Sequence, residues 1–578
     1  MAKHSKKARK PAMKHPAPAT PSTSFILSPR WEPFLAGVIF LIGLSLRLVH
    51  LFESKGSDPF FAAPSVDSNV YYEWAQTIVQ GNGEAQGVFF QSPLYPYFLA
   101  LLFFCFGEGF VGPRIVHALL GALSGVLVFF IGKRVFDARV GLIAGLLQAT
   151  HLVSIYFESL FLVGAIQIPL LLGLLLVLAV PREQAGVVRM AVAGLLLGLA
   201  ALARPDVLLF GGFVVGWLLF AGRDVVGIAR RAATAGVFCV AALGAILPAT
   251  LHNVRSGDAV LISTQAGANF YIGNGRGANG MFNVPPDFSA TDADDPVQQR
   301  EVYARVAQER SGRALKPSEV SAFWLKEGLS MVAAHPLRWM GLVRDKFLLF
   351  FNHYEIYNSG DFYSAKAFST VLRLPLPTFG IIGVLGLLGM VASLGERRRA
   401  GLLYAMAATH LLTALLFFVV VRYRLPAVPV LAIFAGCAVV RAREALETKD
   451  WRRIGIGFAV LVAASVLVLR EPPARMNEYA VHFNLANRLR NAGRHEQADA
   501  EYRAAAALNS GYISTFNNMA LNCEAAKRMD CAKESWEKVR SMAQAEGNAR
   551  YVERADRHLT WLNRGEFPPA AWDVTASP

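Results

Sequence analysis

The sequence predicts an all-α fold, a polytopic bundle of membrane helices that ends in a small soluble domain of helical repeats. The chain has 578 residues, of which 54% are hydrophobic and only 17% are charged, whereas soluble domains carry about 25% charged residues. Apolar runs recur roughly eleven times between residues 31 and 470, each suited to a helix that crosses a hydrocarbon core of roughly 30 Å. From residue 479 the composition turns polar and rich in alanine, and two segments align at a spacing of 34 residues, the period of the tetratricopeptide repeat.

The first 30 residues are predicted to form a disordered, basic, cytoplasmic tail. They combine Lys and Arg with Pro, Ala, Ser and Thr, and they show no apolar periodicity. The apolar run 34–52 is longer than the about 7 to 15 residues of a signal-peptide core, and it has no small-residue cleavage site. We therefore expect this run to remain as the first membrane anchor.

The positive charges predict the orientation of the chain. A net charge of +15 would suggest a nucleic-acid partner in a soluble protein. Here Lys and Arg gather in short loops between apolar runs, as cytoplasmic loops do, so no nucleic-acid partner is predicted. The run 94–106 is only about 13 residues long and is predicted to be interfacial or re-entrant, because a crossing there would place every later basic loop on the wrong side. The predicted spans are 34–52, 115–132, 140–157, 160–180, 190–203, 207–220, 232–250, 374–394, 402–421, 425–440 and 454–469.

Three parts follow from this topology. Residues 1–30 form the tail, residues 31–470 form the membrane domain, and residues 471–578 form an extracytoplasmic, tetratricopeptide-like domain. Two long polar loops of the membrane domain, 53–113 and 251–373, are predicted to lie outside with it.

The repeat domain is predicted from matching core positions. Small alanines at a helix contact, followed by a bulky aromatic residue, allow two antiparallel helices to pack closely. The matching positions are Leu485-Ala486 with Met519-Ala520, Leu489 with Cys523, Ala498 with Ala532, Tyr502 with Trp536, and Ala505 with Val539. The amphipathic stretch 549–562 can cap the stack, and the alternative is a generic helical hairpin. Two repeats bury little core, so we expect the domain to lean on a neighbour or on the membrane domain.

Two further features of the repeat domain are predicted. Cys523 and Cys531 fall on facing helices of one repeat and are expected to form a disulfide in an oxidising compartment; two buried thiols are the alternative. A concave repeat surface commonly holds a protein or peptide, so a protein partner is possible for this domain, although no residue identifies one.

Charged side chains at the outer ends of the spans are the candidate catalytic groups. Asp67 lies in the first outer loop, and Glu158 lies where a span leaves the membrane. The topology places Arg204, Arg422 and Arg424 at the same depth. Two carboxylates can deprotonate an acceptor hydroxyl or hold a divalent metal, and arginine can neutralise a phosphate leaving group.

These motifs resemble the C-type glycosyltransferase superfamily, of the protein O-mannosyltransferase and lipid A aminoarabinose transferase kind, over about residues 47–431. The motifs are Asp67 followed by Tyr71-Tyr72, Ser92-Pro93-Leu94-Tyr95-Pro96, Arg204-Pro205, and Arg422-Tyr423-Arg424-Leu425-Pro426. The segments 269–274 and 351–356 are similar to those of bacterial members that carry tetratricopeptide tails. One departure is Gln91-Ser92, where many relatives have a basic residue and a second proline.

The resemblance implies an inverting transferase that moves a hexose or pentose from a polyprenyl phosphate to an envelope acceptor outside the bacterial inner membrane. It implies Asp67 as the catalytic base, with Glu158 at the acidic position of the second outer loop. The expected substrate-binding residues are Tyr71, Tyr72, Tyr95, Arg204, Arg422, Tyr423 and Arg424. Mg²⁺ or Mn²⁺ is the possible cofactor, with Asp67 and Glu158 as its only candidate ligands. The acceptor stays open between a protein, a lipid and a glycan.

Two other classes of function compete with this interpretation. A transporter or lipid flippase would also have many helices, but it predicts two related halves, and the membrane region shows no internal duplication. A membrane scaffold would act through the repeat domain alone. Other motifs are interpreted as structural: the acidic run 292–295 as a solvated turn, the glycine-rich segment 273–277 as a loop, and the histidines as packing or hydrogen-bonding residues.

Overall fold

The computed structural model describes residues 29–64, 66–82, 87–180, 186–220, 227–283 and 296–472, then 478–569, together with residues 184 and 285. Throughout these ranges every regular element is a helix, and one isolated bridge joins Met281 to Val419. The predicted all-α class is therefore confirmed. Almost all of the predicted basic tail and the whole acidic run 292–295 lie outside the described residues.

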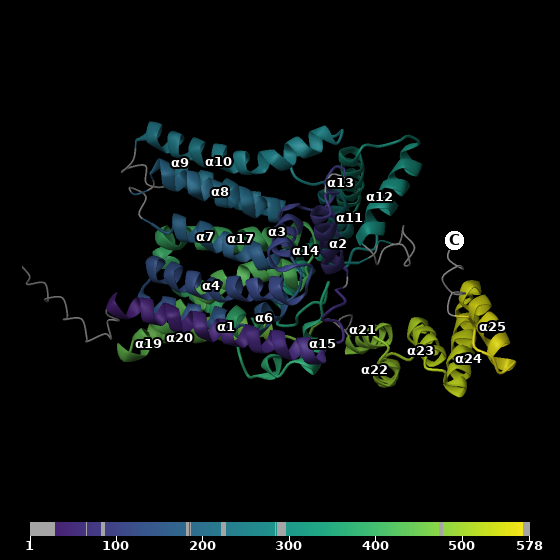
Figure 1. Cartoon of the computed structure of the whole chain (residues 1–578). Helices are drawn as coiled ribbons and strands as arrows, with labels where there is room; N and C mark the ends of the chain where they lie inside the picture. Colours follow the sequence, from purple (N-terminus) through teal and green to yellow (C-terminus); the bar gives the residue numbers. More distant parts are fainter. Residues whose placement is uncertain are drawn as a thin grey trace, which may run out of the picture.

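The apolar helices of the predicted spans lie side by side along one direction, as Figure 1 shows. They are α1 (Glu32–Ser57), α4 (Val111–Val135), α5 (Ala138–Ala149), α6 (Leu152–Glu158), α7 (Gly164–Leu178), α8 (Val187–Ala203), α9 (Leu208–Phe220), α10 (Ile228–Arg255), α16 (Phe379–Ala392), α17 (Arg397–Leu416), α19 (Val428–Glu447) and α20 (Trp451–Leu469). Most of their contacting faces form one large apolar core, and a smaller cluster joins α1 to α4 and α5. Large apolar side chains on their outer faces stay exposed, as lipid-facing surfaces require.

Six helices of the described residues are long and apolar enough to cross a membrane, and the pair α5 and α6, bent by 53°, would make a seventh. The chain is thus a multi-pass membrane protein. Four of the shorter apolar helices, α7, α8, α9 and α16, coincide with the other predicted spans. The exact number of spans stays a prediction. The remaining short helix, α3 (Leu94–Phe106), has 13 residues, so it is about 20 Å long and shorter than the core of a bilayer.

The helices of the two predicted outer loops gather at one end of the bundle (Figure 1). These helices are α2 (Asp67–Val79), α11 (Ala266–Asn274), α12 (Pro296–Ser311), α13 (Pro317–Ala334), α14 (Pro336–Phe351) and α15 (Phe362–Ala365). Segments about two hundred residues apart in the sequence therefore meet above the same ends of the apolar helices.

The C-terminal helices extend beyond this same end (Figure 1). They are α21 (Glu478–Asn491), α22 (His495–Leu508), α23 (Ile513–Ala525), α24 (Met529–Glu546) and α25 (Ala549–Asn563). The paired positions of the 34-residue spacing are buried or partly buried, and Tyr502 and Trp536 are fully buried. Leu559 and Leu562 of α25 pack against the apolar core between α23 and α24, as expected of a cap. The architecture is that of stacked helical hairpins, and the tetratricopeptide assignment stays a prediction.

The first hairpin of the repeat domain packs on the membrane domain. Phe60 and Phe368 lie against its small core of Leu485, Leu489 and Tyr502. Arg494 donates a hydrogen bond to the carbonyl of Ser57 at the end of α1, with an N···O distance of 3.2 Å. This packing confirms that the short repeat array leans on the membrane domain.

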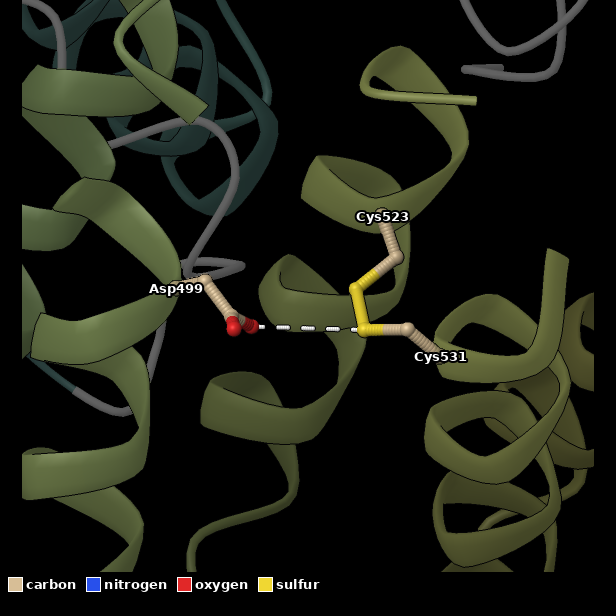
Figure 2. Close-up of side chains that lie close together, drawn as sticks. All are labelled: Asp499, Cys523 and Cys531. Carbon is tan, nitrogen blue, oxygen red and sulfur yellow. Dashed lines mark hydrogen bonds between the residues drawn. A yellow bond between two sulfur atoms is a disulfide. The ribbon is translucent and has the colours of Figure 1, made fainter. Parts of the chain in front are cut away.

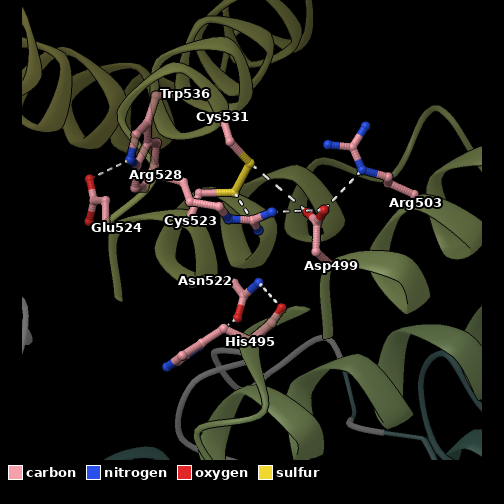
Figure 3. The surroundings of a disulfide bond; sticks show 9 residues. All are labelled: His495, Asp499, Arg503, Asn522, Cys523, Glu524, Arg528, Cys531 and Trp536. Atoms are coloured by element: carbon pink, nitrogen blue, oxygen red, sulfur yellow. Dashed lines mark hydrogen bonds and ion pairs between the residues drawn. A yellow bond between two sulfur atoms is a disulfide. The ribbon is translucent and has the colours of Figure 1, made fainter. Parts of the chain in front are cut away.

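Cys523 and Cys531 form the predicted disulfide between α23 and α24 (Figure 2). Asp499 lies beside it and accepts hydrogen bonds from Arg528 and Arg503, at 3.2 and 3.1 Å (Figure 3). Within the described ranges, Asp499 and the two cysteines are the only group of three side chains close enough to share a metal. Because the sulfur atoms are bonded to each other, these residues do not form a thiolate metal site.

Candidate active site

Asp67 is the centre of a buried polar cluster at the outer end of the bundle. It begins α2, and the preceding Val66 has a φ of 52°, a conformation that β-branched residues rarely adopt. The Asp67 side chain accepts a hydrogen bond from Ser359 Oγ at 2.6 Å and another from Gln91 Nε2 at 3.2 Å. It also forms an ion pair with Arg422. Three segments far apart in the sequence therefore hold one carboxylate.

Arg204 and Arg422 lie on the same aromatic ring. The guanidinium of Arg204 is 3.8 Å from the centroid of the Tyr423 ring, and that of Arg422 is 5.4 Å from it. Arg204 follows the last residue of α8 and pairs with Asp206 at 3.2 Å. A cation over an aromatic face is attracted to the ring, so Tyr423 brings two positive charges together beside Asp67.

Glu158 lines a cavity with Arg204 and Arg422, yet it has a partner of its own. Its Oε2 accepts a hydrogen bond from Arg47 Nε of α1 at 2.6 Å, and both side chains are buried. Arg47 also donates to the carbonyls of Gly43 and Ala149, at 3.0 and 2.8 Å. The bend between α5 and α6 places Glu158 at this position.

Tyr71, Tyr72 and Tyr95 make ring contacts that hold α2, the helix that begins with Asp67. The rings of Tyr71 and Tyr95 meet edge to face at 5.1 Å, and Tyr95 is fully buried. Tyr72 stacks on Phe110 at 5.0 Å, and burial raises the pKa of Tyr71 and Tyr72. These contacts join α2 to α3 and α4. The predicted role of the three tyrosines in substrate binding stays untested, and Tyr95 has no exposed surface with which to meet a ligand directly.

Arg424 is directed away from Asp67. It pairs with Glu355 at 2.6 Å, donates to the carbonyls of Phe350 and Tyr354 at 3.2 and 3.3 Å, and lies 3.8 Å from the centroid of the Phe379 ring. Both members of this ion pair are buried. The structure thus separates Arg422, which meets Asp67, from Arg424, which fastens the segment 350–355.

The structure adds residues that the sequence reasoning missed. Ser359 belongs to no motif, and Gln91 stands out in the sequence only as a departure from the pattern of relatives; both donate to Asp67. Arg47 carried a usable signal, because a charge inside an apolar run is costly and requires a partner. The glycine-rich segment 273–277 has a packing role at Gly273, where a side chain would collide with the backbone of Phe417.

A divalent metal shared by Asp67 and Glu158 does not fit these surroundings. Asp67 pairs with Arg422, and Glu158 pairs with Arg47, so each carboxylate already carries a compensating cation. Neither carboxylate belongs to a group of three possible metal ligands within the part of the chain that the structure describes.

Comparison with known proteins finds one family model that matches part of the membrane domain. Residues 91–251 match the family of dolichyl-phosphate-mannose-protein mannosyltransferases. This stretch begins at Gln91, beside Asp67, and includes Glu158 and Arg204. No curated protein matches the chain.

Some solved structures are loosely similar. The oligosaccharyltransferase AglB of Archaeoglobus fulgidus, in complex with an inhibitory peptide and a dolichol-phosphate, has 15% identity and a TM-score of 0.40, over 81% of this chain and 59% of that one. The same archaeal enzyme with Zn and sulfate has 14% identity and a TM-score of 0.39, over 80% and 56% of the two chains. ArnT of Cupriavidus metallidurans, bound to undecaprenyl phosphate, has 14% identity and a TM-score of 0.32, over 73% and 80%.

The chain thus spans 59% of the length of AglB. Structural similarity at these low TM-scores carries no argument about activity. The family match is the informative comparison. Over residues 91–251 the chain is similar to the dolichyl-phosphate-mannose-protein mannosyltransferases, which confirms the resemblance that its motifs predicted.

Proposed function

We propose that the chain is an inverting glycosyltransferase that moves a sugar from a polyprenyl-phosphate donor to a hydroxyl of an envelope acceptor, at the outer face of the cytoplasmic membrane. One observation carries the proposal. A buried carboxylate, Asp67, meets Arg422 beside Arg204, within and next to the segment that matches the mannosyltransferase family. These are the groups that a phosphate leaving group and a hydroxyl nucleophile require together.

The proposed reaction is a single displacement. Asp67 accepts the proton of the acceptor hydroxyl while the hydroxyl oxygen forms a bond to the anomeric carbon of the sugar. The bond from that carbon to the phosphate oxygen breaks, and the polyprenyl phosphate leaves with the electron pair. Attack opposite to the leaving group inverts the anomeric configuration.

Arg422 and Arg204 are the candidate groups for the phosphate. Both line the cavity that Glu158 shares, and guanidinium groups bind phosphate oxygens through paired hydrogen bonds. When a phosphate engages Arg422, the ion pair between Arg422 and Asp67 is weakened, and the carboxylate becomes available to take a proton. Positive charges fixed where negative charge develops lower the barrier to this kind of transfer.

We also propose that Asp67 and the repeat domain both face the outside of the cytoplasmic membrane. Helix α2, which begins with Asp67, and the helices of the repeat domain lie at the same end of the bundle (Figure 1). This arrangement is required if both face the outside of the membrane. The disulfide between Cys523 and Cys531 is consistent with an oxidising compartment on that side. The repeat domain is a candidate surface for a protein partner or acceptor.

A transporter would more naturally place its charged site near the middle of the bilayer, whereas Asp67, Ser359 and the first repeat hairpin gather at the end of the helix bundle. A scaffold would not need the buried pair of Asp67 and Arg422. These observations favour the transferase.

Mass spectrometry of envelope lipids, glycans and glycoproteins tests the proposal, with and without the gene. The transferase predicts that one glycosyl mass is lost from one class of acceptor and that its polyprenyl-phosphate donor accumulates. Unchanged envelope masses, or a donor trapped only on the cytoplasmic leaflet, would contradict it.

A further inference from the structure

A second cavity is lined by Ser359, one of the residues that hold Asp67. It is bounded by the outer end of α1, by α4, by the end of α6, by the segment before α15, and by α21 of the repeat domain. Its polar lining includes Ser54, Asp58, Arg114, Ser359 and Arg488. One wall thus comes from a domain that begins more than four hundred residues after Asp67.

This cavity reaches the carboxylate of Asp67 through one serine, Ser359, and a second serine, Ser68, lines it nearby. Ser359 lines the cavity and donates its hydroxyl to Asp67 Oδ2 at 2.6 Å. Ser68, the residue after Asp67, also lines the cavity; it is 3% exposed, and its hydroxyl has no partner in the structure. A buried hydroxyl without a partner costs free energy, so it marks a place where a polar ligand group can bind.

The size and lining of the cavity limit what it can hold. Its volume is about 40 Å³, room for roughly three water molecules. That space suits a hydroxyl-bearing arm and excludes a whole sugar ring. Arg114 donates to the carbonyls of Ser159 and Phe61. Arg488 brings further donors to the lining, and the half-buried Asp58 can accept.

Arg488 is fixed in this position by its neighbours. Its guanidinium lies 5.0 Å from the centroid of the Phe60 ring, and the carboxylates of Asp58 and Asp361 in the membrane domain are near enough to attract it. The nearby hydrogen bond from Arg494 to Ser57 holds the same hairpin in place. Movement of the hairpin would open the wall that Arg488 closes.

We propose that this cavity is the acceptor subsite, which receives the reactive hydroxyl arm of the acceptor, and that Arg488 of the repeat domain is a positioning residue for it. The inference rests on the proposed function and deepens it. The acceptor hydroxyl takes the place of the Ser359 hydroxyl on Asp67, while the donor phosphate occupies the cavity of Arg204 and Arg422. The repeat domain is then part of the transferase site.

The first experiment uses a probe that imitates a hydroxyl arm. In the full chain with Cys105, Cys239 and Cys437 replaced by alanine, Ser68→Cys is treated with 2-hydroxyethyl methanethiosulfonate, and labelling is followed by intact mass. We expect the added hydroxyethyl group to fill the cavity and to lower formation of the envelope product at least tenfold. The control is Ser510→Cys, at an exposed turn of the repeat domain, where labelling should leave transfer unchanged. Full transfer by labelled Ser68→Cys would overturn the proposal.

The second experiment tests Arg488. Loss of a charge-assisted hydrogen bond predicts a drop in transfer of about tenfold or more for Arg488→Gln, with partial rescue by Arg488→Lys. Arg488→Gln should also speed the labelling of Ser68→Cys by a bulky maleimide. The matched control is Arg503→Gln, on the exposed side of α22, which should behave as wild type. If Arg488→Gln changes neither the rate of transfer nor the labelling of Ser68→Cys, the acceptor subsite is contradicted even where Asp67 proves essential. An active Asp67→Asn variant would instead contradict the proposed function itself.

Discussion

Arg47 of α1 and Glu158 of α6 form a buried ion pair, with 2.6 Å between Nε and Oε2, at the wall of the cavity that Arg204 and Arg422 share. Two charges inside a membrane domain neutralise each other here, so neither is left unpaired in an apolar environment. The pair gives Glu158 a structural role beside any role in catalysis.

Glu158→Gln leaves the Arg47 charge buried without its partner. Removal of one member of a buried ion pair commonly costs about 3 to 5 kcal/mol, so we expect less folded protein in the membrane and a lower melting temperature. The double variant Arg47→Met with Glu158→Met removes both charges and should recover the amount of folded protein. If Glu158 also serves the reaction, the double variant stays slow in transfer. Full activity of the double variant would assign Glu158 to structure alone.

Gly121 of α4 faces this ion pair so closely that a side chain there would collide with Glu158 Oε2 and Arg47 Nε. Gly121→Ala should therefore destabilise the protein by about 1 to 3 kcal/mol or more, because it forces the buried pair apart. Gly37→Ala on α1 is the matched control, since a methyl group there meets open space. Melting temperatures in detergent compare the two, and equal stability of both variants would show that the pair adapts without cost.

The first outer loop and the repeat domain should be accessible from outside. Cysteines introduced at Asn69 and Gly511, in the background that lacks Cys105, Cys239 and Cys437, are labelled with an impermeant thiol reagent in intact spheroplasts. We expect both sites to react, because an odd number of crossings places them on the side opposite to the basic tail. Protection of both sites until the cells are lysed would reverse the topology.

Lys346 of α14 is fully buried, and its ammonium group donates to Asn274 Oδ1 at 2.9 Å and to the carbonyl of Leu415 at 3.1 Å. Burial lowers the pKa of Lys346 to about 7. The unfolded state therefore binds more protons than the folded state between about pH 7 and the usual lysine pKa of about 10.4, so the folding stability rises with pH across that window.

Lys346→Met should remove this pH dependence. We expect the variant to be more stable than wild type near pH 7 and the difference to shrink as the pH rises toward about 10. Lys326→Met, on the exposed side of α13, is the control and should show no such trend. A constant difference in melting temperature across this range would mean that Lys346 stays charged in the folded protein.

How far the sequence predicts this molecule depends on how local the signal is. Hydrophobic runs predict the helices, and the 34-residue spacing predicts that Tyr502 and Trp536 are buried at equivalent positions of two repeats. Both signals can be read because they lie within neighbouring segments of the sequence. The contact between Ser359 and Asp67 joins residues 292 positions apart, and no local pattern encodes it. Arg422 and Arg424 have the same residue type in one motif, yet the turn of the helix directs one to Asp67 and the other to Glu355.

The central claim is that Asp67 is the base of a sugar transfer. Asp67→Asn keeps the size of the side chain and can still accept hydrogen bonds, but it cannot take the proton of the acceptor. The control is Asp345→Asn on the exposed side of α14, which should transfer normally. The measurement is the rate of product formation by equal amounts of inserted protein, and loss of a general base predicts a fall of about a hundredfold to ten-thousandfold for Asp67→Asn. Transfer by folded Asp67→Asn at close to the wild-type rate would contradict the account.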